Sequence, residues 1–314
     1  MKHLVLVKQH SCIQLGHLYE HLFCNEIKKM MYKKKLYANI DYTLQGLTYD
    51  RGGIIEVDLN LISPEAEKLE HQIKDMSLKF NDNLISLALK QISAEESSLL
   101  AGNNKKSVLN ELTLLNNQKW QQLGEMSLID SRKILIKDEP VKLSETTKIR
   151  VQKVFTRVTL DNQFSKNNRD LLPLFFAVVQ PMLYTAQDQL SIQYGGYREK
   201  ISFNNSIFKA ELKILGEPST LKVNEMLNNL LTSINYQIKN HLPEKVIARL
   251  HEKTNDLFYI EDFQCVGQET GIYIGLNGWK KIANLHNVSK LLSHTKIELR
   301  IGKNKIDSYL NDYK

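Results

Sequence analysis

The chain is poor in the features that mark secreted, membrane-spanning or disordered proteins. Among its 314 residues are only 3 cysteines, an odd number at wide spacing, which argues against a disulfide framework and favours a reducing compartment. With 6 prolines and 14 glycines, long disordered linkers are not expected. The most apolar run, residues 171–184, is too short for a transmembrane helix and contains two prolines. The apolar residues at the start of the chain are likewise too few for a secretory signal, so the sequence predicts a cytoplasmic protein.

The charge balance is basic, with a net charge of +7. Much of the excess lies in two lysine clusters, Lys28–Lys29 and Lys33–Lys35, which suit a solvated helix face. Such clusters can also attract an acidic peptide or a nucleic acid, but no nucleic-acid-binding motif accompanies them. We therefore expect no nucleic acid and no membrane among the partners of this chain.

The segment Gly16–Leu22 carries two histidines one helical turn apart, with a glutamate just before the second. On a helix, residues i and i+4 project from the same face, so His17 and His21 can direct two imidazoles at one ion. Two imidazoles, a carboxylate and an open position for water make a typical catalytic zinc site. Glu20 lies beside the pair and could act as general base on the zinc-bound water. The alternative is a solvated or partly buried helix face without chemical function.

The order H-x-x-E-H, from His17 to His21, is that of the inverted zincins. Together with a predicted strand at residues 3–7, and with Gly16 and Leu22, it resembles the pitrilysin/insulinase family of zinc peptidases, which includes the mitochondrial processing peptidase. The resemblance extends in outline over most of the chain, which would be a short member. It implies Zn²⁺ as cofactor, a peptide substrate, and an acidic third ligand in the helical region after a hairpin.

Three glutamates compete for the role of third zinc ligand. Glu95 and Glu96 lie near the family's usual distance from His21. However, the segment Ser93–Glu96 has the S-x-x-E form of a capping box, which gives Glu96 a structural role at a helix start. Glu111 lies within a predicted helix, beside apolar residues, in a Val-Leu-x-Glu pattern that resembles the family's ligand helix. We predict Glu111 as the ligand, with Glu95 or Glu96 as alternatives and a surface position as the other role for Glu111.

Residue periodicity predicts an α+β fold of two related halves, residues 1–143 and 144–314. Each half should contain an antiparallel or mixed sheet with helices packed on one face, and the halves should close over a cleft. Polar, irregular residues at 124–146 suggest the boundary. In the first half we expect a hairpin of strands 37–47 and 55–61, then helices at 64–80, 82–92 and 94–120. In the second half we expect strands at 148–160, 201–203, 208–214, within 257–276, and at 296–301, and helices at 171–187, 219–241, 243–256 and 278–293.

The resemblance also concerns the binding of the substrate carbonyl in the second half. There the family offers an arginine and then a tyrosine, at the spacing that separates Gln187 and Tyr194 in this chain. Only the tyrosine matches. Because a phenol can donate a hydrogen bond to a developing oxyanion, the resemblance implies that role for Tyr194. The alternative is an ordinary aromatic residue at a turn.

The leading interpretation is a zinc-dependent peptidase for extended peptides, with His17, His21 and Glu111 on the metal and Glu20 as general base. The alternative is a non-catalytic relative that serves as a binding or partner subunit of an active protease. The missing arginine favours this alternative, whereas the retained Glu20 speaks against it. We expect a homodimer or a partner peptidase-like subunit as possible assemblies. The remaining histidines form no spaced cluster, so the sequence does not indicate a second metal.

Overall fold

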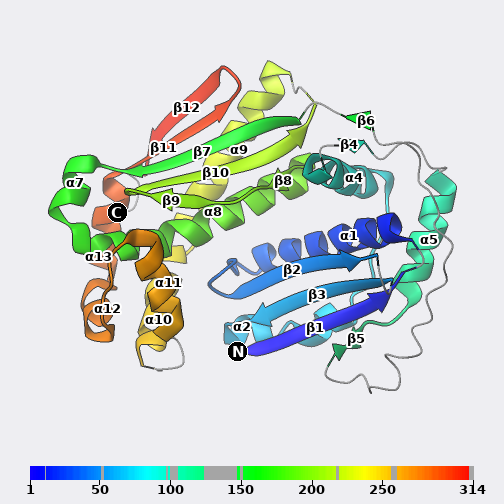
Figure 1. Ribbon diagram of the computed structural model, residues 1–314, viewed down its shortest axis with the longest axis horizontal. Coiled ribbons are helices and arrows are strands. Elements are labelled where there is room, and N and C mark those ends of the chain that lie inside the picture. The colour runs from blue at the N-terminus through cyan, green and yellow to red at the C-terminus, as the bar shows by residue number, and fades with distance from the viewer. Residues whose placement is uncertain are drawn as a thin grey trace. The chain divides into compact units, whose positions relative to one another are not determined.

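The computed structural model describes residues 1–10, 12–50, 53–96, 98–99, 105–123, 147–148, 151–216, 219–255 and 260–310. The chain divides into two compact units, both built from antiparallel strand pairs and helices (Figure 1), so the predicted α+β class is confirmed. The predicted boundary at 143/144 lies outside the described residues, and closure over a cleft stays a prediction. Unit 1 is Met1–Val151 with Ser191–Tyr197 and Ile214–Gly216, and unit 2 is Gln152–Leu190, Arg198–Lys213 and Glu217–Lys314.

Unit 1 contains a four-stranded sheet in the order β2-β3-β1-β5. The predicted hairpin is present as β2 and β3, whose antiparallel register places Tyr42 opposite Leu61. Along β3, every second residue is buried, as expected for a strand with one face on a core. Strand β2 is the outer strand of this sheet on one side. The strands are β1 (Lys2–Gln9), β2 (Tyr42–Tyr49), β3 (Ile54–Leu61) and β5 (Gln121–Gln122).

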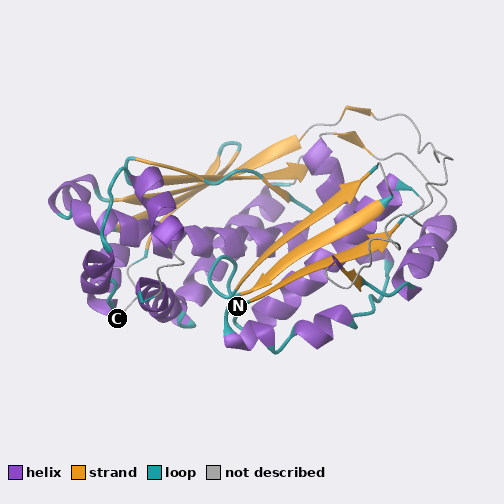
Figure 2. Cartoon of the chain, turned by 60° about the horizontal axis from the view of Figure 1, so that its bottom comes forward, coloured by secondary structure: helices purple, strands orange, loops and turns teal. Residues whose placement is uncertain are grey.

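Helix α1 (Ile13–Lys33) packs on one face of this sheet and carries the H-x-x-E-H motif. Figure 2 shows α1 behind the strands of unit 1. Leu18, Leu22 and Phe23 recur at helical spacing and are buried, which accounts for the docking of α1 through its apolar side. Helix α4 contacts the other side of α1. The further elements of unit 1 are α2 (Pro64–Glu67), α3 (Glu70–Lys74), α4 (Asp82–Glu96), β4 (Ser98–Leu99), α5 (Lys105–Asn117) and β6 (Thr147–Lys148).

The helix boundaries in this region differ from the prediction in a way that matters for the site. Helix α4 continues to Glu96, so Ser93 lies inside its last turn and does not cap a new helix. Ile92, Ser93 and Ala94 are buried, and this packing holds the helix together past the expected end. The predicted capping box is therefore wrong. The predicted helix 64–80 is also interrupted, because α2 and α3 are two short helices.

A buried lysine joins β1 to helices α1 and α5. Lys8 is only 4% exposed, and its Nζ donates hydrogen bonds to the Tyr19 hydroxyl on α1 and to the Leu115 carbonyl on α5, both at 2.9 Å. The ammonium also lies 4.6 Å and 4.7 Å from the ring centres of Tyr19 and Trp120. Burial lowers the pKa of Lys8 from 10.5 to about 8. The unfolded chain therefore holds this proton more tightly than the folded chain does.

Unit 2 is organised around α8 (Leu172–Tyr194) and a larger sheet in the order β12-β11-β7-β10-β8, with β9 paired to β10. Phe175 and Phe176 of α8 pack against Phe203 and Phe208 of the sheet, with ring centres 5.4 to 6.4 Å apart. The strands are β7 (Val151–Leu160), β8 (Tyr197–Arg198), β9 (Ser202–Asn204), β10 (Ile207–Leu215), β11 (Thr295–Ile301) and β12 (Asn304–Tyr309). The other helices are α7 (Asn162–Asn167), η2 (Arg169–Leu171), α9 (Thr220–Lys239), α10 (Leu242–Thr254), α11 (Ile260–Thr270), α12 (Leu276–Ile282) and α13 (Leu285–Ser293).

Several elements of unit 2 correct the prediction. The expected strands within 257–276 are wrong where α11 lies, because Phe263, Val266 and Thr270 follow a helical period. Phe263 then packs on Trp279, with ring centres 5.1 Å apart. The expected helix 278–293 is two helices, and Asn284 caps the second through its side chain. Strand β12 was not predicted.

The two units repeat one topology, as the sequence order suggested. In the unit 1 sheet, the order β2-β3-β1-β5 places the β2–β3 hairpin on one side of the first strand, β1, and the last strand of that sheet, β5, on its other side. In unit 2 the corresponding path is β8-β10-β7-β11, again with a hairpin beside the first strand and a late strand on its other side. In both units a long helix, α1 or α8, follows the first strand. The predicted relation between the halves is therefore confirmed at the level of topology.

Candidate metal centre

The start of α1 is held close to β2 by a glycine one position before the first histidine. A Cβ on Gly16 would lie 2.7 Å from Cδ2 of His10 and 3.1 Å from Cγ2 of Thr48. Distances this short leave room for hydrogen only, so glycine permits the close packing of helix and sheet. The next residue is His17. The motif is thus presented by a helix whose position on the sheet is closely defined.

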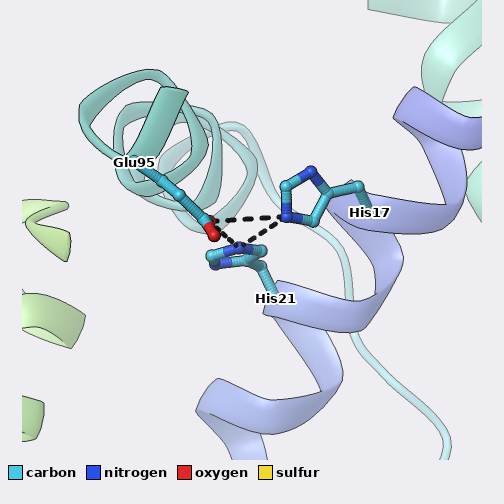
Figure 3. Close-up of side chains that lie close together, drawn as sticks. All are labelled: His17, His21 and Glu95. Carbon is cyan, nitrogen blue, oxygen red and sulfur yellow. Dashed lines mark hydrogen bonds and ion pairs between the residues drawn. The ribbon is translucent and has the colours of Figure 1, made fainter. Parts of the chain in front are cut away.

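His17 and His21 direct their Nε2 atoms at each other and at a carboxylate of α4. The two Nε2 atoms are 3.1 Å apart. Oε2 of Glu95 lies 3.3 Å from Nε2 of His21 and 3.5 Å from Nε2 of His17. Figure 3 shows the two imidazoles on α1 and the carboxylate reaching them from α4. Within the described ranges, this is the group of three potential metal ligands whose donor atoms lie close together.

These distances fit the corners of a tetrahedral zinc site. Zinc binds imidazole nitrogen and carboxylate oxygen at about 2.0–2.1 Å, so neighbouring donors around one ion should be about 3.3 Å apart. The separations of 3.1, 3.3 and 3.5 Å scatter around that value. Two imidazoles and one carboxylate are also a donor set that catalytic zinc uses. The residues present therefore fit a zinc ion with its fourth position open.

The electrostatics of the cluster favour a positive charge. Burial alone would raise the pKa of the Glu95 carboxyl, but hydrogen bonds from His17 and His21 outweigh it and lower that pKa to about 2. Burial opposes charge on His17, yet the hydrogen bond with Glu95 and the charges of Glu20, Glu95 and Glu96 raise its pKa. The cluster thus attracts either a proton or a metal cation at the point where the three donors meet.

The structure does not bring Glu111 to the histidine pair. Glu111 lies on α5 and is not among the donors that meet His17 and His21, so Glu95 occupies the place expected of Glu111. Glu95 takes this position because α4 continues beyond its expected end at residue 92, and α4 contacts α1. Glu96 approaches the other nitrogen of His17, with Oε1 3.6 Å from Nδ1, and is more exposed.

The Glu20 side chain contacts β2, where a second glycine makes room for it. Its side chain is 7% exposed, and Oε2 accepts a hydrogen bond of 3.1 Å from the Thr48 hydroxyl. A Cβ on Gly46 would lie 2.6 Å from Cδ and 2.8 Å from Cγ of Glu20, and closer still to Oε1. A glycine within a strand often marks such a close approach. Glu20 is therefore a buried carboxylate in a defined position, and its charge acts on His17.

Tyr194 is the last residue of α8, within the segment Ser191–Tyr197 that belongs to unit 1. It is half-buried, and the next residue, Gly195, has a left-handed φ of 70°. Gln187, at the position where the resemblance would place an arginine, is buried in unit 2 with both amide atoms unpaired. Contact of Tyr194 with a substrate carbonyl stays a prediction.

Gln91, which no sequence pattern singled out, contacts His21 directly. Gln91 lies on α4 one turn before Glu95, and its Oε1 is 3.3 Å from Nδ1 of His21. The same oxygen accepts a hydrogen bond of 2.8 Å from Asn25. The i–4 spacing from Glu95 would have placed it on the ligand face of α4, had Glu95 been chosen as ligand.

Comparison with known proteins gives fold likeness only. No protein-family model matches the chain, and no curated protein does. The crystal structure of the periplasmic protease PqqL from Escherichia coli matches with a TM-score of 0.25 and 10% identity, over 93% of this chain and 41% of that chain. The crystal structure of pitrilysin matches with a TM-score of 0.33 and 12% identity, over 95% of this chain and 44% of that chain. This chain spans less than half the length of either, and likenesses this low assign neither family nor activity.

Proposed function

We propose that this chain is a zinc-dependent peptidase whose metal ligands are His17, His21 and Glu95. The observation that carries the proposal is the convergence of three donor atoms at separations of 3.1, 3.3 and 3.5 Å. Those separations suit one tetrahedral ion. Glu20, the remaining acid of the motif, lies on the same helix and acts electrostatically on His17. Glu95 thus replaces Glu111 in the ligand set expected from the sequence.

His17, His21 and Glu95 would hold the zinc ion, which would supply the Lewis acidity that activates water for attack on a carbonyl. Glu20 accepts the proton of that water on a carboxylate oxygen and later gives it to the leaving amine. The Thr48 hydroxyl and the space above Gly46 keep the carboxylate in place between these two transfers. Tyr194 donates a hydrogen bond from its phenol to the carbonyl oxygen as negative charge develops there.

Extended peptides are the substrates that suit this arrangement. Strand β2 is the outer strand of the unit 1 sheet and runs past Glu20 through Gly46 and Thr48. A peptide added along such an edge binds through main-chain hydrogen bonds, which tolerate varied side chains. We place the activity in the cytoplasm, because three cysteines at wide spacing suit a reducing compartment. None of the helices in the described ranges has the length and hydropathy needed to cross a membrane.

Substitution of the base tests the proposal while leaving the metal ligands intact. Glu20→Gln keeps the size of the side chain and can still interact with Thr48, but it cannot accept the proton from water. We expect this variant to bind one zinc ion like the wild type and to lose cleavage of a quenched fluorescent peptide library, by about a hundredfold or more. Undiminished cleavage by the purified variant would refute the proposal.

The second candidate is a non-catalytic partner subunit of an active protease. It is favoured by Gln187, because a buried amide within unit 2 replaces the arginine that the resemblance would place there. Such a subunit would have no need of a metal. Metal analysis therefore separates the two functions, since a partner subunit should purify without stoichiometric zinc. A homodimer or a complex with a peptidase-like partner is compatible with both functions.

A further inference from the structure

Gln91 is a buried amide whose hydrogen-bonding groups are all engaged. It is 3% exposed and lies on α4 one turn before Glu95. Its Oε1 accepts from Asn25 at 2.8 Å and faces Nδ1 of His21 at 3.3 Å. Its Nε2 donates to the Ser191 hydroxyl at 3.0 Å and to the Ser191 carbonyl at 3.2 Å, with Oδ1 of Asn25 at 3.3 Å. The amide therefore connects α1, α4 and the end of α8 within unit 1.

The orientation of this amide is fixed by the Ser191 carbonyl. A carbonyl oxygen can only accept a hydrogen bond, so the group that faces it must be the Gln91 amino group. The Gln91 oxygen is then the atom that faces His21. Since that oxygen can only accept, Nδ1 of His21 must carry the hydrogen. In the neutral imidazole the remaining nitrogen, Nε2, then keeps its lone pair and points toward His17 and Glu95.

The segment that follows Ser191 packs closely on α4. A Cβ on Gly195 would lie 2.6 Å from Cβ of Lys90 and 3.0 Å from the Leu87 carbonyl oxygen, and the φ of Gly195 is 70°. The amides of Gly195 and Gly196 donate to the Ser191 carbonyl at 2.9 and 3.2 Å. Ser191 and Gly196 also contact through the serine hydroxyl. Tyr194 lies inside this folded segment, so whatever holds Ser191 also holds the segment that carries the tyrosine.

The geometry points to Gln91 as a positioning residue with two tasks. It sets the His21 tautomer that leaves Nε2 free to bind a metal, and it docks the Tyr194-bearing segment Ser191–Tyr197 on α4. The inference rests on the proposed zinc site. Partners of this kind, which bind the second nitrogen of a ligating histidine, commonly contribute about tenfold to a hundredfold to metal affinity or activity.

Two substitutions separate the tasks. Gln91→Met keeps the approximate length of the side chain and removes both the acceptor and the donor. Gln91→Glu keeps an acceptor for His21 and Asn25 but cannot donate to Ser191. Gln72→Met, the same change at an exposed position of α3, is the matched control. Zinc affinity is measured by competition with a fluorescent chelator, and hydrogen exchange of the amides at 191–197 is measured on the metal-free protein.

We expect Gln91→Met to weaken zinc binding by about tenfold to a hundredfold and to speed exchange at 191–197. Gln91→Glu should bind zinc at least as tightly as the wild type, because a carboxylate is a better acceptor for the Nδ1 hydrogen, and yet show the same faster exchange. Gln72→Met should match the wild type in both measurements. Wild-type zinc affinity in Gln91→Met, or unchanged exchange in both Gln91 variants, would overturn the inference.

The tautomer itself is read from imidazole nitrogen chemical shifts of the metal-free protein, at a pH where His21 is neutral. Hydrogen on Nδ1 in the wild type and in Gln91→Glu, with a mixture of tautomers in Gln91→Met, supports the role of Gln91. Hydrogen on Nε2 in the wild type contradicts it. A wild type that binds no zinc would refute the proposed function, whereas the tautomer measurement would still decide the role of Gln91.

Discussion

Adding a single methyl group to β2 should disable the base without removing the metal. In Gly46→Ala, the new Cβ would lie 2.6 Å from Cδ and 2.8 Å from Cγ of Glu20. Carbon atoms in contact prefer about 3.5–4.0 Å, so the end of the Glu20 side chain must move by about 1 Å or more. It cannot do so and keep its hydrogen bond of 3.1 Å from Thr48.

The size of the effect follows from that displacement. Misplacing a reacting group by about 1 Å can cost about a hundredfold in rate. Loss of the hydrogen bond to the carboxylate should lower the free energy of unfolding by about 1.5–3 kcal/mol, and the melting temperature should fall with it. We therefore expect kcat/KM on a quenched fluorescent peptide library to fall about a hundredfold in Gly46→Ala, while zinc affinity changes by less than about threefold.

A matched substitution controls for the change of glycine itself. Gly275 has a φ of −68°, and a Cβ built there meets no atom within 4 Å, so Gly275→Ala should retain activity. Wild-type cleavage by a zinc-loaded Gly46→Ala protein would refute the assignment of Glu20 as a base held by β2. Parallel loss of zinc and cleavage would also refute it, because the change would then act through the metal ligands.

Two further predictions concern the third ligand and the buried lysine. Glu95→Ala should weaken zinc binding by about a hundredfold or more in a chelator competition, whereas Glu111→Ala should bind like the wild type; the reverse order would restore Glu111 as ligand. Because burial lowers the pKa of Lys8 to about 8, unfolding free energy should rise with pH between about 8 and 10.5 and carry a penalty of up to about 3 kcal/mol below pH 8. Lys8→Met removes this penalty and also loses the Lys8 hydrogen bonds, so the unfolding free energy at pH 7 should rise by about 1–2 kcal/mol. Urea titrations at pH 7 and 9.5 should then show a smaller pH dependence than in the wild type. A variant less stable than the wild type at pH 7 would contradict the assigned cost of burying Lys8.

Local patterns predicted the parts of the molecule that depend on neighbours in sequence. The histidine spacing of one helical turn placed His17 and His21 on one face of α1, and the structure brings their Nε2 atoms to 3.1 Å. The alternation of β3 and the turn before it predicted the hairpin with β2. The order of strands and helices also predicted the two related units.

The choice among the three glutamates depended on a helix boundary that differs in the structure. The S-x-x-E pattern of Ser93–Glu96 is typical of a helix start, but it also fits within a last helical turn. Packing decides between the two, since Ile92 and Ala94 are buried and α4 continues. The contact of Gln91 with Ser191 was beyond sequence reasoning for a related reason. Ser191 is 100 residues away, and no local pattern encodes a contact of that separation.

X-ray absorption at the zinc edge tests the central claim most directly. The wild-type protein is loaded with about one equivalent of zinc, and the coordination shell is measured in solution. The account predicts only nitrogen and oxygen ligands at about 2.0–2.1 Å, with the outer-shell scattering of two imidazoles. A shell that contains sulfur or fewer than two imidazoles, or a protein that retains no stoichiometric zinc, would contradict it.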